Sequence, residues 1–415
     1  MILKLILINI LVALVVGEKV RYDNYALYKV HPENEDHLKF LNELYKKNDR
    51  LDFWKPPTVV NEVVSVVSPP ELKAEFEHSL KKRSIRSEIT LENIQEAFDA
   101  QLYSRKKRST SNELYWTNYQ TLEDIYNWFN HLASTQSSVV STFIVGQSYE
   151  GRNITGIKIT RGSGTRAFFL QSGEIGADWL SPTILTYIAN QLINSNDPEI
   201  KAAADDFTWY ILPLVNPDGF QFSQDSVRTW VKNRHATSTT TIGVDLTKNW
   251  NAHWGINGAS FTMSANNYAG LGPFSELETR AVSNFIESVA SSLTGFLSFR
   301  SFGQRLLIPY AQQNVPTGNY NDIVTIGRRA MGSLAVRYNT QYLVGTSTLV
   351  HNGATGAITD WVKYRYNTTI AATYLLRDTG VHGYALPVSQ ITPSGEETLD
   401  SLLAIIREAR FINVL

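Results

Sequence analysis

The amino-acid sequence predicts an α/β protein with a large hydrophobic core, preceded by a smaller unit of four strands and two helices. Strand-like and helix-like patterns alternate over residues 109–415 without repeats or low-complexity tracts, which is typical of a sheet covered by helices. The chain of 415 residues is 43% hydrophobic and 11% aromatic, and its length suggests two or three domains at about 150 residues each. The sequence contains no cysteine, which excludes disulfides, thiolate zinc sites and thiol nucleophiles.

Residues 1–17 read MILKLILINILVALVVG, one lysine followed by an apolar run and small residues, which fits a cleavable signal peptide. A transmembrane anchor is the alternative, but the run is shorter than the roughly 20 apolar residues that a membrane span needs. No other stretch is long enough, so we expect a secreted, extracellular chain without a membrane span. Sequons at Asn153 and Asn367 predict glycosylation, which is meaningful on such a secreted surface.

Residues 18–108 have the pattern of a small independent domain. Apolar periodicity predicts strands and helices at these positions: strands 25–30, 51–54, 62–67 and 88–91, and helices 34–47 and 70–82. If the short segment 51–54 is a strand, the order is β-α-β-β-α-β, the split βαβ or ferredoxin-like arrangement. Residues 91–102 are expected to form a helix that connects this domain to the rest of the chain.

The tetrabasic run Arg105-Lys106-Lys107-Arg108 marks the boundary between this segment and residues 109–415. A charged, solvated linker is one interpretation of the run. We favour a processing site ending at Arg108, because the segment before it looks self-contained and exposed linkers between domains are open to proteases.

The second unit is predicted to contain strands that are buried on both faces. Four apolar runs are the candidates: 167–170, 208–214, 295–299 and 370–376. Ser181 before Pro182 is expected to cap one helix, and Ser275 with Glu278 has the spacing of a capping box. A further amphipathic helix is expected over residues 396–410.

Five separated strings of the second unit carry a family resemblance. They are Asp178-Trp179-Leu180-Ser181-Pro182, Asn216-Pro217-Asp218-Gly219-Phe220, Gly243-Val244-Asp245-Leu246, Pro273-Phe274-Ser275-Glu276 and Leu376-Arg377-Asp378-Thr379-Gly380. In this order they resemble secreted zinc metallocarboxypeptidases of the A/B type, which are made with a pro-domain. The resemblance implies a mixed β-sheet sandwiched between helices, an active cleft at the strand ends, and an inhibitory pro-domain over residues 18–108.

The residues at the metal positions that this resemblance implies do not suit zinc. The family holds zinc with two His and one Glu and leaves one position open for water. The first two ligands would be Ile175 and Asp178, and the third would be Arg300. Isoleucine has no donor atom, aspartate is one methylene short of glutamate, and a guanidinium has no free lone pair. We therefore expect no zinc cofactor, and we expect Asp178 and Arg300 to form an ion pair, since a lone buried aspartate would be costly.

The catalytic positions that the resemblance implies are also replaced. The general base, a glutamate directly before Leu-Arg-Asp-Thr-Gly, is Leu375, and no carboxylate lies in the residues just before it. The oxyanion-polarising arginine is Val231, and the mobile tyrosine position falls on Asn352. No other nucleophile or phosphate-binding motif replaces them.

The substrate-binding positions are partly retained. Arg228 keeps the first arginine of the family's Arg-x-Trp-Arg string. The Asn-Arg pair that clamps the substrate carboxylate is Thr247-Lys248, where lysine keeps the charge but loses the bidentate fork. The position that governs side-chain specificity falls on Thr359.

These residues favour a secreted, catalytically inactive carboxypeptidase-like protein that acts as a binding or regulatory homologue. The alternative is a working zinc carboxypeptidase that removes C-terminal residues from peptides. The expected partners are peptides or protein C-termini and a processing protease at the tetrabasic run. A net charge of -1 with interspersed signs provides no basic surface for nucleic acid.

Overall fold

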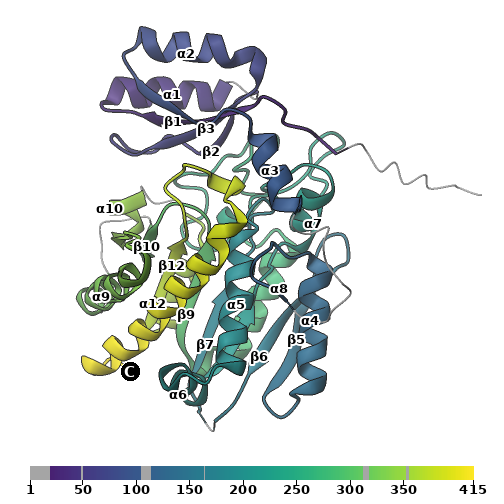
Figure 1. Cartoon of the computed structure of the whole chain (residues 1–415), viewed down its shortest axis with the longest axis vertical. Helices are drawn as coiled ribbons and strands as arrows, with labels where there is room; N and C mark the ends of the chain where they lie inside the picture. Colours follow the sequence, from purple (N-terminus) through teal and green to yellow (C-terminus); the bar gives the residue numbers. More distant parts are fainter. Residues whose placement is uncertain (1–18, 48–49, 104–113, 163, 312–316, 352–354) are drawn as a thin grey trace, which may run out of the picture.

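The computed structural model describes residues 19–47, 50–103, 114–162, 164–311, 317–351 and 355–415 (Figure 1). Three predicted features lie outside these residues: the signal peptide at 1–17, the tetrabasic run at 105–108, and Asn352. No helix in the described part of the chain is long and apolar enough to cross a membrane.

The first unit is an antiparallel sheet of four strands with two helices packed on one face (Figure 1). Its elements are β1 (Ala26–His31), α1 (Glu35–Lys47), β2 (Asp52–Lys55), β3 (Val64–Ser68), α2 (Lys73–Lys82) and β4 (Arg86–Leu91). The strand order β2-β3-β1-β4 confirms the predicted split βαβ arrangement. Because side chains alternate along a strand, Tyr28 of β1 packs on Phe76 of α2 while Leu27 faces the second unit. The connecting helix is α3 (Ile94–Tyr103).

The second unit is built on an eight-stranded mixed sheet with the order β11-β10-β12-β9-β7-β8-β6-β5. Its strands are β5 (Val140–Gln147), β6 (Asn153–Ile159), β7 (Ala167–Gln171), β8 (Thr208–Leu212), β9 (Leu293–Arg300), β10 (Arg305–Ile308), β11 (Leu343–Thr346) and β12 (Ile370–Leu375). The central strands β8, β7, β9 and β12 run parallel to one another and are the four predicted apolar runs. Every residue of β7 and β12 is buried, as expected for strands covered on both faces.

Helices cover both faces of this sheet. On one face lie α4 (Leu122–Thr135), α5 (Leu180–Asn194), α6 (Pro198–Asp206), α9 (Tyr320–Tyr338) and α12 (Ile391–Phe411). On the other lie α8 (Leu277–Val289) and α11 (Ile358–Tyr366), while α7 (Pro217–Asp225) and α10 (Ser347–His351) lie in connections. Along β7, Phe168 and Leu170 contact the first group and Phe169 the second. The mixed sheet between helices is therefore confirmed.

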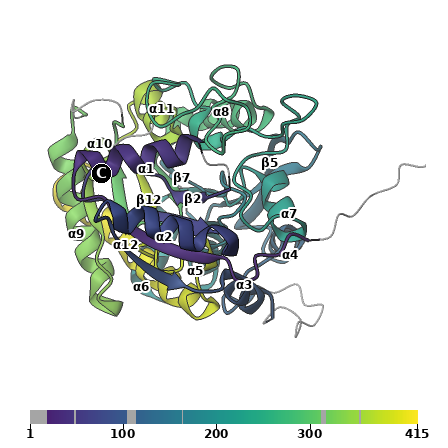
Figure 2. The same ribbon diagram turned by 90° about the horizontal axis from the view of Figure 1, so that it is seen from above.

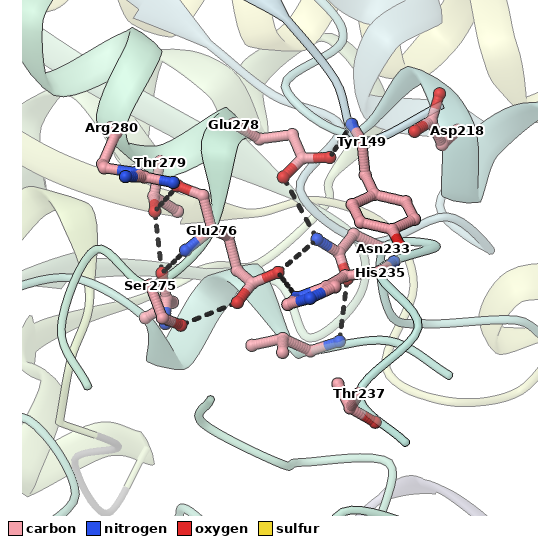
Figure 3. Close-up of polar contacts among 12 residues, drawn as sticks. Tyr149, Asp218, Asn233, His235, Thr237, Ser275, Glu276, Glu278, Thr279 and Arg280 are labelled. Atoms are coloured by element: carbon pink, nitrogen blue, oxygen red, sulfur yellow. Dashed lines mark hydrogen bonds and ion pairs between the residues drawn. The ribbon is translucent and has the colours of Figure 1, made fainter. Parts of the chain in front are cut away.

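The predicted capping box at the start of α8 is wrong. The N-cap residue is Glu276, so Ser275 lies one residue outside the capping position. Figure 3 shows that Glu278 does not reach back to Ser275; its carboxylate accepts hydrogen bonds from the Tyr149 amide and from Asn233 Nδ2, each at 3.1 Å. Fixed donors from distant loops satisfy this buried carboxylate in place of the local cap.

The predicted cap at Ser181 is also wrong, because this residue lies inside α5. Helix α5 has Trp179 as its N-cap residue. The Ser181 amide and hydroxyl both donate to the carboxylate of Asp178, at 3.0 and 2.8 Å. Asp178 therefore supplies the acceptor that the first turn of the helix needs.

The first unit lies over the edge of the large sheet, with α1 and α2 on the outside (Figures 1 and 2). One hydrophobic cluster spans the two units and includes Leu27, Trp54, Phe98, Ala177, Phe302 and Tyr384. Beside this cluster, Glu62 of the first unit lies 2.9 Å from both Lys55 and Arg305. The backbone amide of Val20 also donates to the carbonyl of Ser226 at 2.9 Å. The two units thus share apolar, ionic and backbone contacts.

Candidate active site

The parallel strands bring the predicted metal and base positions to one edge of the sheet. In the register of β9 and β12, Arg300 pairs with Leu375, the last residue of each strand. The loop after the neighbouring strand β7 carries Ile175 and Asp178. Ligand sites of α/β sheets lie outside the carboxyl ends of parallel strands, so the positions named from the sequence are at the expected place.

A cavity of about 520 Å³ lies between this edge and the first unit. From the second unit it is lined by Ile175, Val231, Thr247, Lys248, Arg300 and Leu375, together with polar loop residues and two aromatic rings. From the first unit it is lined by residues of α1 and β2, including Tyr45, Asp52 and Trp54. Six of the positions predicted from the sequence therefore line one cavity.

Asp178 is buried behind the cavity, and hydrogen bonds occupy its carboxylate. Besides the two hydrogen bonds from Ser181, the carboxylate accepts hydrogen bonds from the Ser301 amide and the Ser301 hydroxyl, each at 2.6 Å. The predicted ion pair with Arg300 is wrong: no carboxylate oxygen of Asp178 lies within ion-pair distance of the guanidinium. Serine hydroxyls and helix amides supply four fixed donors, so this aspartate is satisfied without a cation.

The Nε atom of Arg300 has no hydrogen-bond partner among the described residues, although it is buried. The positive charge of Arg300 acts on two buried carboxyl groups nearby. Burial raises the pKa of Glu174, and Arg300 opposes that rise. Burial likewise raises the pKa of Asp360, to about 7, although the Ala311 amide and Arg300 both favour the charged form.

Thr247 and Lys248 hold a second positive charge at the cavity. The Lys248 ammonium donates to Thr247 Oγ1 at 3.0 Å and lies 3.9 Å from the Asp245 carboxylate. Asp245 in turn accepts the Thr247 amide and hydroxyl, at 3.0 and 2.7 Å. Burial lowers the pKa of Lys248, which Asp245 opposes and Arg300 reinforces. The pair is thus held in place within the second unit.

The remaining predicted positions at this edge are apolar. Leu375 is buried, and Ile175 and Val231 are partly buried. None of the three carries an atom that can bind a metal or accept a proton. Among the described residues, no group of three His, Cys, Asp or Glu side chains is arranged to hold a metal ion.

Arg228, predicted as a residue of the substrate cleft, lies instead in the contact between the units. It is 1% exposed, and its guanidinium stacks on Trp179 at 3.6 Å from the ring centroid. It donates to the Gln101 side chain at 3.1 and 3.2 Å, and to the carbonyls of Ala177 at 2.8 Å and Tyr384 at 2.7 Å. Burial lowers its pKa to about 9. The prediction is wrong because the contact with α3 cannot be read from the local string.

Thr359, the predicted specificity position, lines a smaller adjoining cavity of about 40 Å³. Its hydroxyl hydrogen-bonds with that of Thr373 at 2.6 Å. Thr247, Lys248 and Arg300 line both cavities, so the small cavity lies beside the large one. This space admits little more than a water molecule, so it cannot take a large side chain.

Comparisons with known proteins identify families that match this sequence. A family model described as zinc carboxypeptidase matches residues 125–401, and one described as carboxypeptidase activation peptide matches residues 28–101. The chain belongs to the zinc carboxypeptidase family. The resemblance drawn from the five sequence strings is thereby confirmed.

Relatives within the zinc carboxypeptidase family match nearly the whole chain. Zinc carboxypeptidase A 1 of Anopheles gambiae is 35% identical over 395 residues, which cover 95% of this chain and 91% of that protein. The crystal structure of thrombin activatable fibrinolysis inhibitor is 22% identical, with a TM-score of 0.86 over 93% of this chain and 98% of that one. Bovine thrombin-activatable fibrinolysis inhibitor, solved in complex with tick carboxypeptidase inhibitor, is 25% identical, with a TM-score of 0.67 over 73% and 100%.

The zinc of this family does not fit the residues found here. Ile175 has no donor, Arg300 is a cation, and the carboxylate of Asp178 is occupied by four hydrogen bonds. A zinc carboxypeptidase mechanism cannot be assigned to these three positions. Sequence reasoning missed the residues that complete this arrangement, Ser301 and Gln101. Ser301 was visible beside Arg300, but its bond to Asp178 depends on how two strand ends meet.

Proposed function

We propose that this member of the zinc carboxypeptidase family is a secreted, catalytically inactive homologue that binds peptides or protein C-termini without cleaving them. The observation that carries the proposal is the set of contacts around Asp178, because its four hydrogen bonds take the place of a metal. The cation Arg300 at the neighbouring strand end would repel Zn²⁺.

The other steps of the family's reaction lack their groups as well. Leu375 cannot accept a proton from a nucleophilic water, and Val231 cannot stabilise an oxyanion. The related structure that contains a tick carboxypeptidase inhibitor supports a protein partner for this fold. Retained charge at Lys248 supports attraction of a carboxylate.

The alternative function is a zinc carboxypeptidase with rearranged ligands. The names of its relatives favour it, since they are called carboxypeptidases. Family membership alone does not determine activity, because function depends on the residues of the site. The alternative requires a ligand set other than Ile175, Asp178 and Arg300.

Elemental analysis and turnover measurements on the purified secreted protein test this proposal. After incubation with zinc and gel filtration, we expect substoichiometric metal and no release of C-terminal residues from reporter peptides. An active carboxypeptidase A treated in parallel is the control for loading and assay. Chelator-sensitive turnover of about 1 per second or more, an ordinary enzyme's rate, would establish the alternative.

The domain organisation belongs to the same proposal. We infer a signal peptide over 1–17, a pro-domain over 18–108 that ends at a processing site at Arg108, and a carboxypeptidase-like domain over 109–415. Glycosylation is proposed at Asn153 and Asn367, and both residues are exposed. Mass determination of the secreted protein before and after glycosidase treatment tests these modifications.

A further inference from the structure

The cavity between the two units has on its wall a positive charge that makes no direct ion pair. Among the described residues, the Arg300 guanidinium forms no ion pair, and its buried Nε has no hydrogen-bond partner. The buried carboxylates that feel its charge are engaged elsewhere: Glu174 accepts Trp250 Nε1 at 2.8 Å and Asp360 accepts the Ala311 amide at 2.7 Å. The guanidinium is partly buried and makes no direct ion pair, so an external anion would be stabilised beside it.

Lys248 adds a second positive charge on the same wall, since it and Arg300 line both the large and the small cavity. Its nearest carboxylate, Asp245, is 3.9 Å away and already accepts two hydrogen bonds from Thr247. Lys55 in the lining of the large cavity is paired with Glu62 at 2.9 Å. Among the other charged lining residues, cations still outnumber anions: Lys46, Lys248 and Arg300 against Asp52 and Asp245. The lining therefore favours a negatively charged ligand.

The rest of the lining suits an apolar body. Aromatic rings from both units face the cavity: Tyr45, Phe53, Trp54, Phe302 and Tyr384. Ile175, Val231 and Leu375 add aliphatic surface on the side of the strand ends. The volume of about 520 Å³ lies within the range of roughly 300–1,000 Å³ that is usual for small-molecule sites.

We propose that this cavity binds an amphipathic organic acid, with its carboxylate at Arg300 and Lys248 and its apolar body against the aromatic rings. The inference rests on the proposed function, because it assumes a cleft that binds without cleaving. Lys248 stands at the position of the family's carboxylate clamp, whereas Arg300 stands at a metal-ligand position, so the proposed site contains a cation that the family's clamp does not have. The carboxylate can belong to a free acid or to a peptide C-terminus.

Calorimetry on the full chain with its pro-domain tests the inference. The probes are 4-phenylbutyrate and its uncharged analogue 4-phenylbutyramide, with a free-acid tetrapeptide and its amidated form as a second pair. We expect one site per chain and at least about tenfold tighter binding of the acid than of the amide, about 1.4 kcal/mol. The probe pair that shows this preference identifies the source of the carboxylate.

Charge-removing variants locate the site. Arg300→Gln and Lys248→Gln are each expected to weaken acid binding about tenfold and to leave amide binding unchanged. Arg300→Lys keeps the positive charge and is expected to weaken acid binding less than Arg300→Gln does. Arg329→Gln is the control, because Arg329 is 48% exposed and pairs with Glu408. Thermal melting of each variant verifies folding.

Equal affinity for acid and amide, no binding of either acid at millimolar concentration, or equal effects of Arg300→Gln and Arg329→Gln would overturn the inference. Zinc content and peptide turnover are measured on the same sample. A zinc-free, inactive chain that binds neither acid contradicts this inference and leaves the proposed loss of catalysis standing. A zinc-loaded, active chain contradicts the proposed function itself.

Discussion

At the scale of single residues, the charge of one side chain decides what the strand ends attract. A neutral metal ligand at position 300 would bring a cation to this edge, whereas the arginine found there repels one. The carboxylate of Asp178 accepts four hydrogen bonds from Ser181 and Ser301. A carboxylate bound in this way is a structural group, because its lone pairs are no longer free.

Single reversions toward the family's residues are expected to give no activity. Leu375→Glu supplies a base beside no metal, and Arg300→His still leaves Ile175 at the first ligand position. Catalytic groups that act as a unit are strongly non-additive, so partial repair gains almost nothing. The measurement is zinc content and turnover of C-terminal reporter peptides for both variants and for the unmodified chain. Zinc-dependent turnover in either single variant would contradict this expectation.

Asp360 is expected to make stability fall as the pH rises. Burial raises the pKa of Asp360 from its ordinary 3.8 to about 7. The folded chain therefore holds this proton more tightly than the unfolded chain does. The stability linked to this proton is fully present below about pH 3.8 and is lost as the pH rises through about 7.

Asp360→Asn removes this dependence while keeping an acceptor for the Ala311 amide. At pH 8.5 we expect its free energy of unfolding to exceed that of the unmodified chain by at least about 1.4 kcal/mol, the equivalent of one pKa unit. At pH 4 the two should be nearly equal. Urea unfolding across this pH range measures the difference, with Asp322→Asn, an exposed position, as the control. Parallel pH profiles for Asp360→Asn and the unmodified chain would count against the prediction.

At the scale of elements, helix α3 attaches the first unit to the second. Gln101 of this helix accepts from Arg228 and donates to the carbonyls of Tyr384 and Leu386, at 3.0 and 2.9 Å. Phe98, one turn earlier, packs in the hydrophobic cluster shared by the units. The hydrogen bonds between the buried Arg228 and Gln101 therefore attach α3 to the second unit. Removing a partner of a buried charge is destabilising.

Gln101→Ala is expected to destabilise the chain by about 1–3 kcal/mol, because it removes the acceptor of the buried Arg228 Nε and one of the two donors to each of the Tyr384 and Leu386 carbonyls. Glu96→Ala is the matched control, since Glu96 is an exposed residue of the same helix. Urea unfolding followed by tryptophan fluorescence measures both variants. Equal midpoints for the two substitutions would show that α3 is held by apolar packing alone.

At the scale of the whole molecule, the first unit is bound by contacts spread over its length. Val20 donates to the Ser226 carbonyl near the start, Glu62 meets Arg305 in the middle, and α3 docks at the end. In an active zymogen a pro-domain must leave for the enzyme to work. Here the first unit forms one wall of the cavity, and a chain that is inactive, as we propose, would not require its departure.

Cleavage in the tetrabasic run is therefore expected to leave the two fragments associated. Limited trypsin digestion should produce fragments that divide near Arg108 and co-elute on size-exclusion chromatography, separating only in urea. A chain with Arg105, Lys106, Lys107 and Arg108 all changed to Gln should resist the cut. Release of the first fragment in native buffer would contradict the retained pro-domain, and an uncut unmodified chain would refute the processing site.

The fold and the family could be predicted from the sequence because they depend on signals that are local. Apolar runs identified the four central strands, and the order of elements in residues 25–91 identified the split βαβ domain. Two of the five strings also located Ile175, Asp178 and Leu375 by their spacing, and the resemblance placed Arg300 on a later strand. The parallel strands bring these residues to one edge.

The sequence by itself determined which chemical groups stand at the strand ends, because residue type and spacing are written in the chain. Only the tertiary structure decided what those groups contact. Asp178 binds Ser301 instead of Arg300, and Arg228 is buried against α3 instead of facing the cleft. Glu278 likewise turns from its own helix to Asn233. In each case a residue distant in the sequence forms the hydrogen bond, because buried polar groups in folded proteins are hydrogen-bonded and the tertiary structure places that partner within reach.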